Sequence, residues 1–137
     1  MKSAFSSGLA LALALVGACG GANKYVLQGS PAVPAAEGSV KVEEGPNGNT
    51  QLEVEAKHLA PPGRIEPRAS TYVVWAQPLG EDTRATNLGG MRLDDDLSGK
   101  LKTTTPLHHF ELFVTPEASR EAANPAGKRV LSVEVNR

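Results

Sequence analysis

The side chains in this chain that could bind a metal ion include three histidines. His108 and His109 are adjacent, while His58 lies far upstream. Neighbouring residues on a strand point to opposite faces, so His108 and His109 cannot readily hold one ion together. His58 could approach either of them only through the fold. We expect exposed histidines at strand ends and no metal site, with a metal-handling role left as an alternative.

A run of three aspartates, Asp94 to Asp96, offers the hard oxygen ligands that calcium prefers. Calcium loops, however, space their ligands at alternate positions and usually close with a distant bidentate carboxylate. Here the aspartates are consecutive and precede Leu97-Ser98-Gly99, a pattern typical of a turn with an Asx hydrogen bond. The sequence predicts a solvated acidic turn.

No pattern for catalysis accompanies the candidate nucleophiles and carboxylates. The serines lack the glycine pattern of a nucleophile elbow; they include Ser70, Ser98, Ser119 and Ser132. The paired carboxylates, Glu43-Glu44 and Glu53 with Glu55, fall on expected exposed strand faces, where charge keeps a sheet soluble. We therefore expect no enzyme, no catalytic residue and no cofactor.

Four arginines in or near expected loops could serve a binding surface: Arg64, Arg68, Arg84 and Arg92. Arginine is enriched at protein interfaces. The formal net charge of the whole chain is only −1 and no basic patch stands out, so nucleic acid is not an expected partner.

The single cysteine, Cys19, follows Leu15-Val16-Gly17-Ala18 at the end of an apolar run that begins at Leu9. With the basic Lys2 before it, this segment resembles the lipobox of bacterial lipoproteins. The resemblance implies that residues 1–18 are a cleaved signal peptide and that Cys19 receives acyl chains. The apolar run is far shorter than the ~20 residues that cross a bilayer. An ordinary secretory signal that happens to contain a cysteine is the alternative.

Gly20, the residue after the cysteine, indicates which membrane of the envelope the protein would be attached to. Gly20 stands where an aspartate tends to retain Gram-negative lipoproteins at the inner membrane. By that resemblance the outer membrane is favoured, with the domain facing the periplasm or the cell surface. With one cysteine in the chain, no intramolecular disulfide can form.

Residues 19–37 are small, polar and spotted with proline, and we expect them to form a flexible tether after the lipidated cysteine. A short edge strand at 25–27 is the alternative for the apolar part of this segment. From Gly38 onward, apolar residues alternate with charged ones, as in Val40 and Val42, which is typical of half-buried strands. The cluster 45–49 contains Asn-Gly and predicts the turn of a first hairpin. The folded domain is expected to span 38–137.

Further strands are expected at 71–77, 110–115 and 129–135, with a second hairpin over 87–104 and a short helical turn around 118–122. The strand at 71–77 is apolar on both faces, which favours a central position with Trp75 as a core anchor. About seven short strands with regular turns predict an all-β, antiparallel, immunoglobulin-like sandwich.

The stretches 71–76, 87–93, 110–115 and 125–128 together are similar to the extracytoplasmic β-sandwich domain of membrane-bound anti-sigma factors. Those domains pair a Y-x-x-W strand with a later L-G hairpin and a P-x-G turn. The resemblance implies a shared outer domain and not sigma-factor control, because this sequence shows neither the cytoplasmic domain nor the membrane helix of that family.

The sequence as a whole predicts a lipoprotein of the bacterial cell envelope, held in the bilayer through acylated Cys19. Its β-sandwich is expected to be a non-catalytic binding or structural module, with an envelope protein as a possible partner. An envelope sensor or accessory protein related to the outer domain of anti-sigma factors is the second interpretation.

Overall fold

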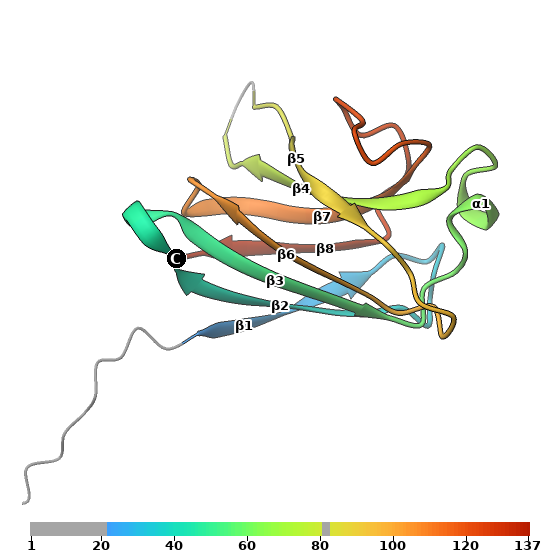
Figure 1. Ribbon diagram of the computed structural model, residues 1–137, viewed down its shortest axis with the longest axis horizontal. Coiled ribbons are helices and arrows are strands. Elements are labelled where there is room, and N and C mark those ends of the chain that lie inside the picture. Colours follow the sequence, from blue (N-terminus) through green and yellow to red (C-terminus); the bar gives the residue numbers. More distant parts are fainter. Residues whose placement is uncertain (1–21, 81–82) are drawn as a thin grey trace, which may run out of the picture.

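The computed structural model describes residues 22–80 and 83–137, so the expected signal peptide and Cys19 lie outside the described residues. The described chain is almost entirely β-structure (Figure 1). Its strands are β1 Asn23–Gly29, β2 Glu37–Glu44, β3 Thr50–Lys57, β4 Thr71–Pro78, β5 Thr86–Met91, β6 Gly99–Thr105, β7 His109–Glu117 and β8 Leu131–Asn136. A 3-10 turn, η1 Pro46–Gly48, and one helical turn, α1 Pro62–Ile65, complete it. The all-β prediction is confirmed.

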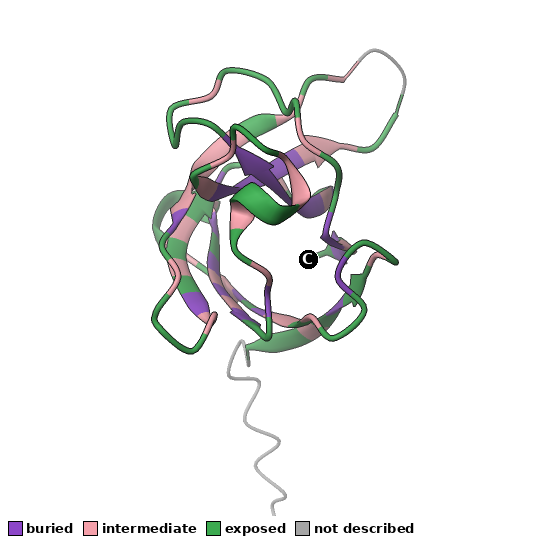
Figure 2. Ribbon diagram, turned by 90° about the vertical axis from the view of Figure 1, so that its right-hand side faces the viewer, coloured by how far each residue is buried: buried purple, intermediate pink, exposed green. Residues whose placement is uncertain are grey.

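All strand pairs are antiparallel, and the eight strands follow the order β5-β4-β7-β8-β1-β2-β3-β6. Strand β1 joins two layers, because Asn23 to Leu27 pair with β2 whereas Gln28 and Gly29 pair with β8. One layer contains β1, β2, β3 and β6, and the other contains β5, β4, β7 and β8. Seen end-on, the strands curl around a common interior (Figure 2).

Strand β1 corrects the expected tether, because residues 23–29 lie within the sheet between β8 and β2. Leu27 is buried against the core, and the hydroxyl of Tyr25 donates to the carbonyl of Asn136 at 2.7 Å. Val33, in the connection to β2, is also buried. Within the described residues, the sheet therefore already includes Asn23, upstream of the expected start at Gly38, and it has eight strands instead of about seven.

The first hairpin lies where it was predicted. Val40 lies opposite Val54 and Val42 lies opposite Leu52, so the apolar residues of both strands share the inner face. At the turn, Asn47 and Gly48 adopt positive φ angles of 60° and 76°, which asparagine and glycine tolerate best.

The second hairpin was predicted wrongly. Strand β5 pairs with β4 and β6 pairs with β3, so only an isolated bridge between Leu93 and Gly99 joins the two segments. Side chains link the two edges elsewhere. The hydroxyl of Thr103 donates to the carbonyl of Leu88 at 2.9 Å. These contacts bring the two edge strands, β5 and β6, next to each other.

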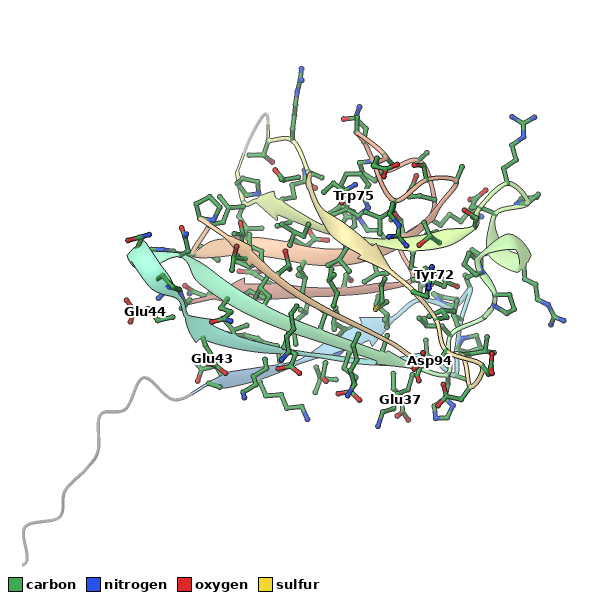
Figure 3. All side chains as sticks on the ribbon, in the orientation of Figure 1. Glu37, Glu43, Glu44, Tyr72, Trp75 and Asp94 are labelled. Carbon is green, nitrogen blue, oxygen red and sulfur yellow. The ribbon has the colours of Figure 1, made fainter. Side chains whose placement is uncertain are left out.

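Apolar side chains between the layers form the main core, and a second cluster lies on the outer face of β4 and β7. Tyr72 belongs to the first cluster and Trp75 to the second, so the two point to opposite faces of β4 (Figure 3). Trp75 and Val73 lie against Phe113, and Ala122 packs on them from the β7–β8 connection. Trp75 is fully buried as predicted, but under a loop instead of between the layers.

The β7–β8 loop does not contain the expected helical turn at 118–122. It contains instead a turn in which the amide of Ala122 donates to the carbonyl of Ser119.

The two ends of the sandwich differ. The start of β1 and the end of β8 lie at one end, here called the terminal end, with the turn before β3 (Figure 1). The opposite, long-loop end carries the connections 30–36, 58–70, 92–98 and 118–130. Figure 3 marks the terminal end by Glu44 and the long-loop end by Asp94. Among the described residues, no helix has the length and apolar character needed to cross a membrane.

Candidate functional site

The three histidines do not come together, because His58 lies at one end of the sandwich and His108 and His109 lie at the other. His58 follows β3 at the long-loop end, whereas His108 precedes β7 at the terminal end, with Nε2 2.7 Å from the carbonyl oxygen of Gly48. His109 Nε2 lies 2.8 Å from a carboxylate oxygen of Glu134. Within residues 22–80 and 83–137, no three histidine, cysteine or acidic side chains come together as metal ligands would.

The aspartate run forms the predicted acidic turn. The amide of Asp94 donates to the carbonyl of Ser98 at 2.7 Å, and the amide of Leu97 donates to the carbonyl of Asp94. The Asp96 carboxylate accepts the hydroxyl of Ser98 at 2.6 Å and its amide at 3.3 Å, as an Asx-type turn requires. The hydrogen bond from the Ser98 hydroxyl lowers the pKa of Asp96 below its ordinary value. All three aspartates are exposed.

Three of the four candidate serines donate side-chain hydrogen bonds within the domain. Ser70 Oγ donates to the carbonyl of Ala118, Ser98 Oγ donates to Asp96, and Ser119 Oγ donates to Glu121. The acceptors are one backbone carbonyl and two carboxylates. Each of these three hydroxyl groups therefore holds a turn or a loop in place.

Three of the four candidate arginines gather at the long-loop end. Arg64 lies in α1, Arg68 follows it, and Arg92 comes directly after β5, whereas Arg84 lies in the connection before β5 at the terminal end. All four side chains are exposed. The long-loop end is thus the part of the surface where the predicted binding residues meet.

A buried carboxylate at this end was not predicted from the sequence. Glu117 ends β7 and is only 4% exposed. Its carboxylate accepts the hydroxyl of Thr115 at 2.6 Å and the backbone amides of Ala126 and Gly127 at 3.1 and 3.0 Å. A buried carboxylate is tolerated when such donors satisfy it, so Glu117 fixes the far part of the β7–β8 loop to the sheet.

The hydrogen bonds continue from Glu117 to the tryptophan. Trp75 Nε1 donates to Thr115 Oγ1 at 2.8 Å, and the Trp75 ring stacks on Phe113 with 6.5 Å between centroids. The guanidinium of Arg129 lies 3.9 Å from the centre of the Phe113 ring and pairs with the Glu111 carboxylate. The loop is therefore held over the outer face at both of its ends.

Two depressions border this loop at the long-loop end. The first, named here the Glu117 groove, has a volume of about 430 Å³ and is lined by residues 66–69, 116–118 and 126–127. The second, named the arginine cleft, has a volume of about 310 Å³. Its lining residues are Pro62, Ser70, Thr71, Met91, Arg92, Leu93 and Arg120. No matching depression was predicted, because residues from distant parts of the chain meet only in the fold.

No protein-family model matches the chain, and a search of curated proteins also found no match.

Proposed function

We propose that this chain is a lipid-anchored protein of the bacterial cell envelope whose β-domain is a non-catalytic binding module directed away from the bilayer. The observation that carries the proposal is the place of β1. Asn23 begins β1 at the terminal end, and Cys19 precedes it by four residues. A fully extended chain covers at most ~3.6 Å per residue, so at most about 14 Å can separate Cys19 from the start of the sheet.

This short connection constrains how the domain sits on a membrane. With the tether reduced to a few residues, the terminal end lies next to the lipid headgroups. Strands of eight residues, such as β3, extend for about 25 Å. The long-loop end, with the Glu117 groove and the arginine cleft, therefore stands away from the bilayer and is open to partners.

The strength of attachment through Cys19 would depend on the number of acyl chains that it carries. Each buried methylene contributes ~0.8 kcal/mol, so one acyl chain binds weakly whereas two or three hold durably. Gly20 favours the outer membrane in this proposal, by its resemblance to the sorting pattern of Gram-negative lipoproteins.

A protein partner in the envelope is the occupant we propose for the Glu117 groove. Its lining combines Pro67, Ala118 and Ala126 with the exposed Arg68. Arginine is among the residue types enriched in protein interfaces, often at the positions that contribute most to binding.

Site-directed photocrosslinking in intact cells tests this function. A photoreactive residue at position 68 should give a crosslinked species of higher mass, and the same residue at position 84, at the terminal end, should not. A Cys19→Ser variant should remain as an unprocessed precursor and lose stable attachment through acyl chains. Crosslinks that are equally strong at both positions would contradict the proposed binding end, and normal processing of Cys19→Ser would contradict the anchor.

A further inference from the structure

The arginine cleft brings two guanidinium groups together from distant parts of the chain. Arg92 follows β5, and Arg120 lies in the β7–β8 loop. A methyl group at Gly90 would lie 2.6 Å from Cβ of Arg120, so the stem of Arg120 rests on Gly90. Arg92 follows Gly90 by two residues, directly after the end of β5, and lines the same cleft as Arg120. The two arginine side chains therefore start from neighbouring places on the outer surface.

The backbone that carries Arg120 is fixed by the sheet. The side-chain amide of Asn87 donates to the carbonyl of Arg120 and to that of Ala122, each at 2.9 Å. In turn, Asn87 Oδ1 accepts the amide of Gly89 at 2.8 Å. The position of Arg120 on β5 is thus built into the structure by a side chain of that strand.

Neither guanidinium is neutralised within the described parts of the chain. Among these residues, no carboxylate oxygen lies within 4.0 Å of Arg92 or Arg120. Asp94 and Glu121 are near Arg92 and Arg120 in the sequence but form no ion pair with them. Glu117, opposite Thr71, already accepts three donors and lines the other groove. Arg129 differs, because Glu111 pairs with it.

The other lining residues complete a site of small-molecule size. Thr71 and Ser70 contribute hydroxyl groups, and Pro62, Met91 and Leu93 contribute apolar surface. The Ser70 hydroxyl proton is directed to Ala118, so its oxygen remains an acceptor, whereas the guanidinium groups supply donors only. The volume of about 310 Å³ is at the lower limit of ligand pockets.

We propose that the arginine cleft binds a phosphate group carried by a small molecule. Two planar guanidinium forks match an anion with several terminal oxygens better than they match a carboxylate, which has only two. This inference goes beyond the proposed function and does not depend on lipid anchoring or on a protein partner.

Calorimetry on the purified protein in non-ionic detergent micelles tests the proposal with three probes: inorganic phosphate, glycerol 3-phosphate and a short-chain phosphatidic acid. We expect glycerol 3-phosphate to bind with a Kd of about 1 mM or tighter, and acetate at least about tenfold more weakly. Arg92→Gln and Arg120→Gln should each weaken binding about tenfold, because each removes a charge-assisted hydrogen-bond donor. Arg64→Gln removes the same charge from the same end outside the cleft and should leave the Kd unchanged.

The outcomes separate the sources of the phosphate group. Equal affinity for glycerol 3-phosphate and phosphatidic acid supports a water-soluble phosphomonoester, and tighter binding of phosphatidic acid supports a lipid headgroup. Absence of binding for all three phosphate probes overturns the proposal, as does acetate binding as tight as phosphate. Equal weakening by Arg64→Gln also overturns it, because the effect would then be one of net charge. Circular dichroism and thermal unfolding of each variant establish that the fold is retained.

Discussion

The Glu117 carboxylate accepts the backbone amide of Gly127 at 3.0 Å, and this bond closes the β7–β8 loop over the outer face of the sandwich. Thr115 supplies a second donor to the same oxygen and receives the indole N–H of Trp75. One buried carboxylate therefore connects a loop backbone to the tryptophan of a central strand. The shape of this part of the long-loop end depends on the connection, because the Glu117 groove and the arginine cleft both border the loop.

Replacing Glu117 with glutamine should lower the free energy of unfolding by about 1–3 kcal/mol, because an amide group cannot accept from all three donors. Urea denaturation measures the loss. Glu121→Gln, a matched change at an exposed position of the same loop, should alter stability by less than about 0.5 kcal/mol. Equal effects from the two variants would show that the Glu117 hydrogen bonds contribute little.

Gly127→Ala should destabilise the domain by about 2 kcal/mol, because the added methyl group would collide with the backbone carbonyl of Pro116. The control is Gly63→Ala, where the nearest atom, the carbonyl oxygen of Ala69, is 3.5 Å from the new methyl group. That variant should unfold close to the parent protein. A Gly127→Ala protein of parental stability would mean that the loop does not pack against Pro116.

Trp75→Ala should cost roughly 3–5 kcal/mol, the range for removing a large buried aromatic side chain. Trp75→Phe keeps one six-membered ring but removes the N–H donor to Thr115 and the rest of the indole, so it should cost about 1–3 kcal/mol, less than Trp75→Ala. Chemical denaturation followed by circular dichroism compares the two variants. A loss below about 1 kcal/mol for Trp75→Ala would contradict the burial of this side chain.

The free energy of unfolding should fall at alkaline pH because of the buried Tyr72. Burial raises the pKa of its hydroxyl to about 12, from an ordinary value of 10.0, and the hydroxyl donates to the carbonyl of Ala60 at 2.5 Å. Because the folded state holds the proton more tightly, this contribution to stability is complete below pH 10 and is lost as the pH rises towards 12. Unfolding measured across that window, with Tyr72→Phe as control, tests it. The variant should lack this phase, and an identical alkaline profile for both proteins would assign the loss to another group.

The alternation of apolar and charged residues was enough to predict the strands with one wet face. Val40, Val42, Leu52 and Val54 lie on the inner face of the predicted hairpin, and 71–77 occupies a central strand as expected. Strand β1 was expected only as the alternative to a tether, because its pattern is mixed. Val26 is 65% exposed, and small and proline residues follow the strand. Its pairing depends on β2 and on the distant β8, which no local pattern reveals.

Less of the candidate site than of the fold could be predicted from the sequence. Arg68 and Arg92 were recognised as loop arginines, but Arg120 and Glu117 were not singled out. Their importance arises from contacts across the fold, with Gly90 in one case and Gly127 in the other. Residues 87–104 were expected to form a hairpin because a turn separates two short strands, but each strand has a longer partner elsewhere in the sheet.

The most direct test of the central claim measures which end of the domain lies on the membrane. The acylated protein is reconstituted in vesicles after Asn47→Cys at the terminal end or Asp95→Cys at the long-loop end, and each new thiol carries a fluorophore. Both positions are exposed, and the strands separate them by about 25 Å. We predict strong quenching by lipid-bound nitroxide at position 47 and little at position 95. Equal quenching at both positions, or stronger quenching at position 95, would contradict the proposed orientation.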